Sequence, residues 1–428
     1  MQQSKYRQSM QKIAILTSLS DLSPAYSVAA SIYDQYTIIS RHGSNEFRVK
    51  VYCNDNFNLS HSKSLDDNWV FNLPSVTWSN YKPSEKPHEN FNTQVKVLED
   101  TYLQIAKEND IIITHDLMFI DSFLSANQAI RNVIDIFPNK TWIHWVHSGP
   151  SMKPEKLVYP SKLRYTAAPH SKYVFLNHTE QQNFANMLSI NTGSVHIVNN
   201  FRDIYSIYGF AKYTRDFIDQ YNLLDHNILQ IYPFSTPRWM AKGVDRLISI
   251  FSTWKDMNQN AKLVLVNAHA NDASLVHVNA IKHAIDSSAL KLGEDIILTS
   301  DYYLDEWKYS VPSRFIAEMN QIANIFIFPS VSEGCSLVQA EASLAGKYIV
   351  LNADCPSMIE FCDSSVLRYK FTINKPIENP VYYWAVANEI LAELKHDKTV
   401  RNSTLARTKT YNSKWIWENQ FRPLLYVS

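Results

Sequence analysis

The chain has 428 residues, more than one hydrophobic core usually serves, so two domains are expected. Lys plus Arg and Asp plus Glu both total 41, and with no net charge the bulk electrostatics neither require nor exclude a polyanionic partner. Apolar residues make up 45%, with 24 Tyr, 20 Phe and 10 Trp, which indicates a packed globular protein.

The sequence lacks the patterns typical of Gly-rich phosphate loops, zinc sites, disulfide frameworks and membrane spans. With only 8 glycines, a Gly-rich phosphate loop is not expected, and neither G-x-G-x-x-G nor the P-loop pattern occurs. Cys53, Cys335, Cys355 and Cys362 have neither zinc nor disulfide spacing, which favours a reducing compartment. No apolar run is long enough to span a membrane, and residues 1–11 are polar and read as a loose tail. We therefore expect a cytoplasmic protein, or one held at a membrane surface.

Strands and helices alternate through the first half of the chain. Strands are predicted at 12–18, 48–52, 110–114, 141–146, 173–176 and 195–198, with helices at about 25–36 and 91–108. This alternation predicts a parallel sheet, in which polar residues that follow the strands share one rim, where open α/β folds bind ligands. His115 and Asp116 follow one strand and His147 follows the next, so we expect all three on that rim.

A basic stretch begins directly after His147. It reads SGPSMKPEKLVYPSKLRYTAAPHSKY and sets one acid, Glu155, against five cations, namely Lys153, Lys156, Lys162, Arg164 and Lys172. One interpretation is a solvated loop. The other is a basic rim at the mouth of a binding site, suited to an anionic partner such as a phospholipid headgroup, a polyprenyl-linked glycan or a nucleic acid backbone.

The second half of the chain repeats the alternation of strands and helices. We expect the first domain at 12–207, a linker at 208–226, the second domain at 227–407, and a C-terminal helix at 408–428. Strands are predicted at 228–232, 262–266, 296–298, 325–328 and 348–351, and helices at about 244–254, 274–290, 313–323, 336–345 and 382–394.

The segment from Ile325 to Asp354, IFIFPSVSEGCSLVQAEASLAGKYIVLNAD, reads as strand, turn, helix, Gly stop and strand. Its turn lies at the carboxyl end of a strand and the start of a helix, where free amides near Cys335, Ser336 and Leu337 favour an anion such as a diphosphate. Glu333, in that turn, would lie beside whatever the phosphates carry. The plain alternative is that Glu333 caps the helix or is solvated.

A second loop, STPRWMAKG, precedes the helix at 244–254 and carries Arg238 and Lys242. Two cations near a helix start are disfavoured by the helix dipole. Because the helix dipole makes this position unfavourable for cations, we favour a role for Arg238 and Lys242 in binding a ligand over the alternative that both are simply solvated.

The frame Pro-Ser-x-x-Glu-Gly-x-x-x-x-x-x-Glu-Ala, which contains Glu333 and Glu341, resembles the Glu-x7-Glu signature of retaining glycosyltransferases with the GT-B fold. The resemblance implies two Rossmann-like domains facing each other across a cleft. It assigns Glu333 to the donor sugar and Glu341 to the nucleotide ribose. Arg238 and Lys242-Gly243 resemble the family's diphosphate clamp, with a slightly shorter spacing.

The first domain is less similar to the family. His147 resembles the histidine that family members place against the donor sugar, and Asn199 to Asp203 resembles a turn that closes the first domain. A C-terminal helix in the family crosses back onto that domain. The loop after the first strand, SLSDLSPAYS, departs from the pattern because it lacks the usual Gly-Gly pair.

The resemblance implies a retaining glycosyltransferase that moves a hexose from a nucleotide diphosphate sugar, a UDP-sugar by default, to a hydroxyl of a glycan or glycolipid. His147 and Glu333 are the expected catalytic residues. His115, Asp116, Lys153 and Lys156 are expected on the acceptor side. No Asp-x-Asp motif occurs, so we expect neither a metal nor a cofactor besides the donor substrate.

Two alternatives stay open. One is a phage-type DNA glucosyltransferase acting on hydroxymethylated pyrimidines, which share this fold and would suit the Gly-poor, Asn- and Tyr-rich sequence. The other is a non-catalytic, sugar-nucleotide-binding relative, which the missing Gly-Gly pair favours and the set Arg238, Lys242, Glu333 and Glu341 opposes.

Overall fold

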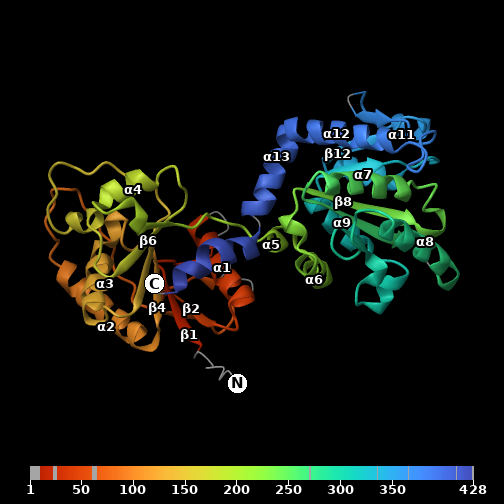
Figure 1. The fold of residues 1–428 in the computed structure, drawn as a ribbon. Helices are drawn as coiled ribbons and strands as arrows, with labels where there is room; N and C mark the ends of the chain where they lie inside the picture. Colours follow the sequence, from red (N-terminus) through yellow and green to blue (C-terminus); the bar gives the residue numbers. More distant parts are fainter. Residues whose placement is uncertain are drawn as a thin grey trace, which may run out of the picture. The chain divides into compact units, whose positions relative to one another are not determined.

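A computed structural model describes residues 10–22, 27–59, 65–268, 271–334, 336–364, 366–410 and 412–426. The chain forms two compact units (Figure 1). The first is Met1–Arg202 together with Ser413–Ser428, and the second is Asp203–Asn412. Each unit, taken by itself, is an α/β structure with parallel strands. The predicted class, two Rossmann-like domains, is confirmed at this level.

The first unit contains a seven-stranded sheet in the order β3-β2-β1-β4-β5-β6-β7, and every neighbouring pair is parallel. The strands are β1 (Gln11–Leu16), β2 (Phe47–Asn54), β3 (Trp69–Leu73), β4 (Ile111–His115), β5 (Thr141–Trp145), β6 (Ser171–Phe175) and β7 (Val195–Ile197). The helices are α1 (Ser27–His42), α2 (Phe91–Glu108), α3 (Leu124–Ile136) and α4 (Gln181–Leu188). The edge strand β3 was not predicted.

Side chains of β1 show how both faces of this sheet are covered. Ile13 and Ile15 pack in one buried cluster with residues of α1, whereas Ala14 and Leu16 pack in another with residues of α2 and α3. Successive side chains of a strand point to opposite faces, so a strand covered on both sides must be apolar throughout. This requirement explains the continuous apolar runs from which these strands were predicted.

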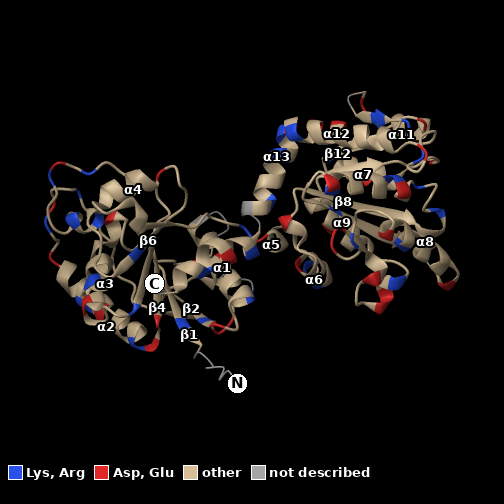
Figure 2. Ribbon diagram, viewed as in Figure 1, with Lys and Arg blue, Asp and Glu red and all other residues tan. Residues whose placement is uncertain are grey.

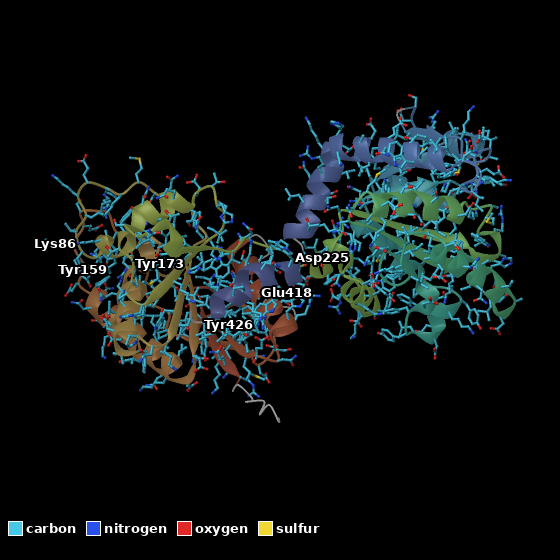
Figure 3. All side chains as sticks on the ribbon, viewed as in Figure 1. Lys86, Tyr159, Tyr173, Asp225, Glu418 and Tyr426 are labelled. Atoms are coloured by element: carbon cyan, nitrogen blue, oxygen red, sulfur yellow. The ribbon has the colours of Figure 1, made fainter. Side chains whose placement is uncertain are left out.

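The C-terminal segment completes the α1 face of the first unit (Figure 3). It consists of α14 (Ser413–Ile416), a π-helical turn (Trp417–Phe421) and α15 (Arg422–Leu425). Trp417 and Phe421 are buried in the cluster that contains α1, and the Phe421 ring meets Trp145 of β5 edge-on at 5.3 Å. At the end of the segment, Tyr426 bonds to Glu46.

The second unit has two three-stranded parallel sheets, β10-β9-β8 and β11-β12-β13. Their strands are β8 (Ile228–Ser235), β9 (Ala261–Ala268), β10 (Ile296–Leu298), β11 (Ile325–Phe328), β12 (Tyr348–Asn352) and β13 (Leu367–Tyr369). β8 and β11 are neighbours. The combined order is therefore the 3-2-1-4-5-6 order of a dinucleotide-binding fold.

Side chains join the two sheets where β8 meets β11. The amide of Gln230 donates to the Ile327 carbonyl at 2.9 Å, and its oxygen accepts from the Ile327 N–H at 3.1 Å. Asn324 adds a second link, because its N–H donates to the Leu229 carbonyl at 3.0 Å and its side-chain oxygen accepts from the Leu229 N–H at 2.9 Å. The Gln230 carboxamide thus occupies the place of a backbone peptide in the ladder.

Helices cover both sides of this composite sheet. α7 (Val244–Asp256) and α12 (Pro380–His396) lie together on one side of β8, and α9 (Ser313–Ile322) lies on the other (Figure 1). The remaining helices of the unit are α5 (Ile204–Tyr208), α6 (Lys212–Gln220), α8 (Leu275–Asp286), α10 (Leu337–Leu344), α11 (Pro356–Ile359) and α13 (Lys398–Leu405). In the part of the chain that the structure describes, no helix is both long and apolar enough to cross a membrane.

The boundaries of the two units differ from those expected. The second unit begins at Asp203, and the stretch 208–226 is not a separate linker. Phe217 is fully buried in the core of the second unit, where its ring meets Phe315 edge-on at 5.1 Å and lies 5.7 Å from Trp307. Residues 408–412 also cluster with the second unit, so the return to the first begins at Ser413.

Candidate functional site

The carboxyl ends of β8 and β11 form the point at which the strand order of the second unit reverses. The connections that leave these two strands run in opposite directions, so a crevice opens outside the ends of the strands, where open α/β sheets bind ligands. The loop after β8 contains Arg238 and Lys242, and the loop after β11 contains Glu333. The strand order therefore brings two predicted site segments to one edge.

Lys242 and Glu333 are in direct contact at this edge. The Lys242 Nζ lies 2.5 Å from Glu333 Oε1, and the side chains are only 17% and 12% exposed. The Ser330 hydroxyl donates to the same carboxylate oxygen at 2.8 Å. A carboxylate that accepts from an ammonium and a hydroxyl is held in one orientation by charge-assisted hydrogen bonds.

The backbones of the two loops are also locked together. The Val331 N–H donates to the Ala241 carbonyl at 2.8 Å, and the buried Tyr232 hydroxyl donates to the Lys242 carbonyl at 2.7 Å. Gly243 has a φ of +70°, and a Cβ at this position would lie 2.5 Å from the Pro329 carbonyl oxygen. Only glycine allows the backbone at position 243 to come this close to Pro329, which explains why glycine follows Lys242.

Side chains of β12 and α11 hold the turn after β11 in place through hydrogen bonds to its carbonyl groups. The Ser357 hydroxyl donates to the Glu333 carbonyl at 2.5 Å, and the Asn352 side chain donates to the Ser330 carbonyl at 3.0 Å. Ser336 is the N-cap of α10, since its hydroxyl accepts from the Gln339 N–H at 3.3 Å. The predicted phosphate cradle is therefore a capped helix start, at which Leu337 is 73% exposed.

Three further residues predicted for the donor do not join the Lys242–Glu333 contact. Arg238 ends a short 3-10 turn with its side chain exposed, on the same loop as Lys242. Glu341 is exposed on α10 and lines a cavity of about 290 Å³ with Ser313 and Asn320 of α9. Cys335 lies outside the described residues.

The sequence interpretation missed a buried polar group at the same edge of the sheet. Asn267, near the end of β9, is fully buried, and within the described ranges neither its side-chain oxygen nor its nitrogen has a hydrogen-bond partner. The Thr236 hydroxyl, after β8, is buried and unpartnered in the same sense. Buried polar atoms are normally bonded, so such groups mark positions where a ligand or water can bind. The only sequence signal is one Asn that ends the apolar run KLVLV.

In the first unit, the rim after β4 and β5 carries the predicted pair of histidines. His115 Nδ1 and His147 Nε2 lie 2.9 Å apart, and the rings stack with centroids 5.2 Å apart. The Asp116 carboxylate accepts from the His147 N–H at 2.9 Å, and Asp116 itself has a left-handed φ of 56°. These residues form one cluster, as their places after neighbouring strands predicted.

Burial decides the protonation of this cluster. It lowers the pKa of His147 to about 4, and burial together with the neighbouring His147 lowers the pKa of His115 well below its usual value. Burial raises the pKa of Asp116 to about 6, against the effect of its bond from the His147 N–H. At neutral pH both rings are uncharged, so one nitrogen of the pair donates and the other accepts. The remaining nitrogen of His115, Nε2, is buried and has no partner within the described ranges.

The cations of the basic stretch after His147, which belong to the first unit (Lys and Arg are blue in Figure 2), differ in their partners. Arg164 lies 2.5 Å from the Asp121 carboxylate and over the Phe119 ring, and the Lys172 ammonium donates to the carbonyls of Leu424 and Tyr426. Lys153 donates to the Ser189 hydroxyl at 3.2 Å, whereas Lys156 and Lys162 are exposed. Two of the five cations are therefore structural, which corrects the interpretation that all five line a binding mouth.

No family model and no curated protein matches the chain. Solved structures similar to it include a glycosyltransferase from Rickettsia africae, which is 12% identical with a TM-score of 0.37 and coverage of 98% of this chain and 100% of that one. Anabaena Alr3699/HepE in complex with UDP-glucose is 14% identical, with a TM-score of 0.33 and 97% of both chains covered. Sucrose-phosphate synthase from Thermosynechococcus elongatus is 11% identical, with a TM-score of 0.34 and coverage of 95% and 96%.

Proposed function

We propose that this chain is a retaining, metal-independent glycosyltransferase that moves a hexose from a nucleotide diphosphate sugar to an acceptor hydroxyl. The observation that carries the proposal is the 2.5 Å contact between Lys242 and Glu333 at the strand-order reversal of the second unit. These two residues come from the two loops that resemble the diphosphate clamp and the Glu-x7-Glu signature.

The chemistry of glycosyl transfer fits these two side chains. Negative charge grows on the leaving diphosphate as the anomeric bond breaks, and a fixed cation stabilises it. The Lys242 ammonium has three donors, so it can keep its bond to Glu333 and still donate to a phosphate oxygen. Glu333, oriented by Lys242 and Ser330, retains acceptor capacity for a sugar hydroxyl. In a front-face transfer the departing phosphate takes the proton of the acceptor.

For the substrates, we propose a UDP-hexose as donor and a glycan or glycolipid hydroxyl as acceptor. His147 is proposed beside the sugar, with His115 and Asp116 on the acceptor side together with Lys153 and Lys156. The engagement of Arg164 and Lys172 within the first unit removes part of the support for a DNA acceptor. Retarded migration of a hydroxymethylated duplex that is sensitive to salt would restore that alternative.

The test is a donor screen in which product formation and UDP release are followed by mass spectrometry. We expect Glu333→Gln and Lys242→Met each to lower kcat/KM by about 100-fold or more, because each removes stabilisation made at the reacting centre. The matched controls are Lys255→Met and Asp295→Asn, which break a Lys–carboxylate pair of 2.6 Å elsewhere in the second unit. These controls should stay within a few fold of the parent.

Near-normal turnover in Glu333→Gln would reject its role at the donor sugar. Saturable binding of UDP-sugars without turnover, across donors and acceptors, would instead support the non-catalytic alternative.

A further inference from the structure

A second cavity lies at the opposite end of the strands of the second unit. Its volume is about 870 Å³, and we call it the basal cavity. It is lined by Asn227 and Ile228 at the start of β8, by Asn260 just before β9, and by side chains of α12 and α13. β8 has 8 residues, so roughly 25 Å of strand separates this end from the Lys242–Glu333 edge. The basal cavity is therefore distinct from the candidate donor site.

The charged residues that line the basal cavity are all cations. Lys395 at the end of α12 and Lys398 and Arg401 on α13 contribute to its wall, and no Asp or Glu is among the described lining residues. None of the three forms an ion pair with any described carboxylate, whereas Lys242, Lys255, Lys282, Lys308, Arg314 and Lys375 of the same unit all do. The neighbouring carboxylate of Asp397 accepts from the Val400 N–H at 2.7 Å as the cap of α13. Three cations around one hollow attract an anion.

A fourth cation, Arg407, contacts the backbone of a residue that lines the basal cavity. Arg407 is fully buried, and its guanidinium donates to backbone carbonyls, including that of Asn227 at 3.3 Å. Its hydrogen bonds go to carbonyl oxygens, and the carboxylate of Asp225 offsets part of its charge. The positive potential of the cavity therefore comes chiefly from Lys395, Lys398 and Arg401 on its wall.

The rest of the lining is neutral, with both polar and apolar parts. Carboxamides and hydroxyls are supplied by Gln259, Asn260, Asn402, Thr404 and Thr408, and the buried side chains of Leu391 and Leu394 add apolar surface. Carboxamides and hydroxyls match the alcohol groups of a sugar or polyol, and aliphatic side chains match its C–H face. Lysine and arginine match a phosphate. A phosphorylated polyol carries all three kinds of group in one molecule.

We propose that the basal cavity binds a phosphorylated sugar or polyol. The ligand would contact α12 through Lys395 and α13 through Lys398 and Arg401, so it would brace the junction of the two helices at Asp397. Binding to the folded state alone raises the unfolding temperature of the unit that carries the site. Neither the binding nor this stabilisation requires the donor site or glycosyl transfer.

The test uses the full chain and glucose 6-phosphate as the soluble probe, in titration calorimetry and thermal unfolding. We expect saturable binding at least tenfold tighter than that of inorganic phosphate or glucose, with a rise in the unfolding temperature of the second unit. The double variant Lys398→Ala/Arg401→Ala should weaken binding at least tenfold. Lys242→Met, at the donor edge, should bind the probe as the parent does.

Two controls keep this outcome interpretable. The double variant Lys370→Ala/Lys375→Ala removes two cations elsewhere in the unit and should leave binding unchanged. The thermal unfolding of Lys398→Ala/Arg401→Ala without ligand should match the parent, since both side chains are exposed. Loss of binding in Lys242→Met with retention in Lys398→Ala/Arg401→Ala would overturn the proposal, as would equal affinity for inorganic phosphate and glucose 6-phosphate.

A second arm distinguishes a soluble ligand from a lipid headgroup. Vesicles of phosphatidylcholine with phosphatidylinositol 4-phosphate are compared with vesicles in which phosphatidylserine supplies the same charge. Capture by the first kind only, lost in Lys398→Ala/Arg401→Ala, would support the proposal with a headgroup as the source. Binding of neither glucose 6-phosphate nor these vesicles would overturn it.

Discussion

Among single residues, Gly243 sets how closely the two loops of the candidate donor site approach. Its φ is +70°, and an added Cβ would lie 2.5 Å from the Pro329 carbonyl oxygen. We expect Gly243→Ala to destabilise the second unit by about 1–3 kcal/mol through backbone strain and steric conflict, and to separate Lys242 from Glu333. Urea unfolding and a donor-binding assay measure the two effects.

Gly149→Ala is the control for this substitution, because nothing lies within 4 Å of a Cβ built at Gly149. Equal stability and equal donor affinity in Gly243→Ala and Gly149→Ala would contradict the expected constraint.

His144 makes the first unit sensitive to acid. It is fully buried on β5, within hydrogen-bond distance of the hydroxyls of Thr114 and Ser171, and burial, with a smaller effect of Arg131, lowers its pKa from 6.5 to about 3. Because the folded pKa lies below the unfolded one, the stabilisation is complete above pH 6.5 and is lost as the pH falls towards 3. It amounts to on the order of 5 kcal/mol across that window.

The prediction is that His144→Gln flattens the fall in unfolding temperature of the first unit between pH 6.5 and 4. His178→Gln, at an exposed position, serves as the comparison. If both variants follow the parent curve, the titration of His144 is not what destabilises the unit in acid.

The Lys-Gly loop and the Glu-x7-Glu frame in the sequence allowed Lys242 and Glu333 to be proposed as contacts of one ligand. Their mutual contact was not predictable, because it depends on β8 and β11 being neighbours in space. Charge counting also failed for Arg164 and Lys172. The sequence shows that these cations are present, but the carboxylate and carbonyls that bind them lie far along the chain.

At the scale of an element, Gln230 holds β8 against β11. Gln230→Leu keeps the volume and leaves the N–H and C=O of Ile327 buried without their partners. We expect a loss of about 2–4 kcal/mol in the stability of the second unit, since unpaired buried polar groups cost more than the bonds contribute. Chemical denaturation of the full chain, with a probe in each unit, measures it.

Gln182→Leu on α4 removes two exposed hydrogen bonds, one donated to Asn186 at 2.8 Å and one accepted from the Thr192 hydroxyl at 2.5 Å, and should change stability by less than about 0.5 kcal/mol. Comparable losses in the two glutamine variants would mean that the joint between the two sheets does not depend on Gln230.

The elements themselves were predictable where burial demands long apolar runs. The strand predicted at 141–146 is observed at Thr141–Trp145, and that at 325–328 is observed unchanged. The stretch 208–226 was misread as a linker because its apolar residues are interrupted by charged ones and form no long run. Their spacing places Phe217 and Ile218 on the buried face of α6, which only packing against α9 makes evident.

At the scale of the whole chain, the first unit depends on a segment from the far end of the sequence. Phe421 is fully buried against the sheet of the first unit. We expect Phe421→Ala to destabilise the first unit by about 3–5 kcal/mol, as truncating a buried aromatic ring does, and to leave the second unit unchanged. Hydrogen exchange resolved by peptide measures both units in one sample, and protection should be lost in the strands of the first unit and kept in those of the second.

Phe361→Ala is the matched control, because Phe361 belongs to the second unit and is 61% exposed. Loss of protection in both units on replacing Phe421 would mean that the two do not unfold independently. Composition and length predicted two domains, but they contain no information on which parts of the chain each domain includes.

This interleaved connectivity has a consequence for biosynthesis. The ribosome delivers the strands of the first unit early, yet the segment 413–425 that covers one side of them is made only after the whole second unit. At typical rates of roughly 5–20 residues per second, the nascent sheet waits on the order of tens of seconds with apolar side chains uncovered, while the contiguous second unit can finish first. Newly made chains should therefore depend on chaperones until residues 413–425 have emerged, and truncation before residue 413 should be far more harmful than the small size of the missing segment suggests.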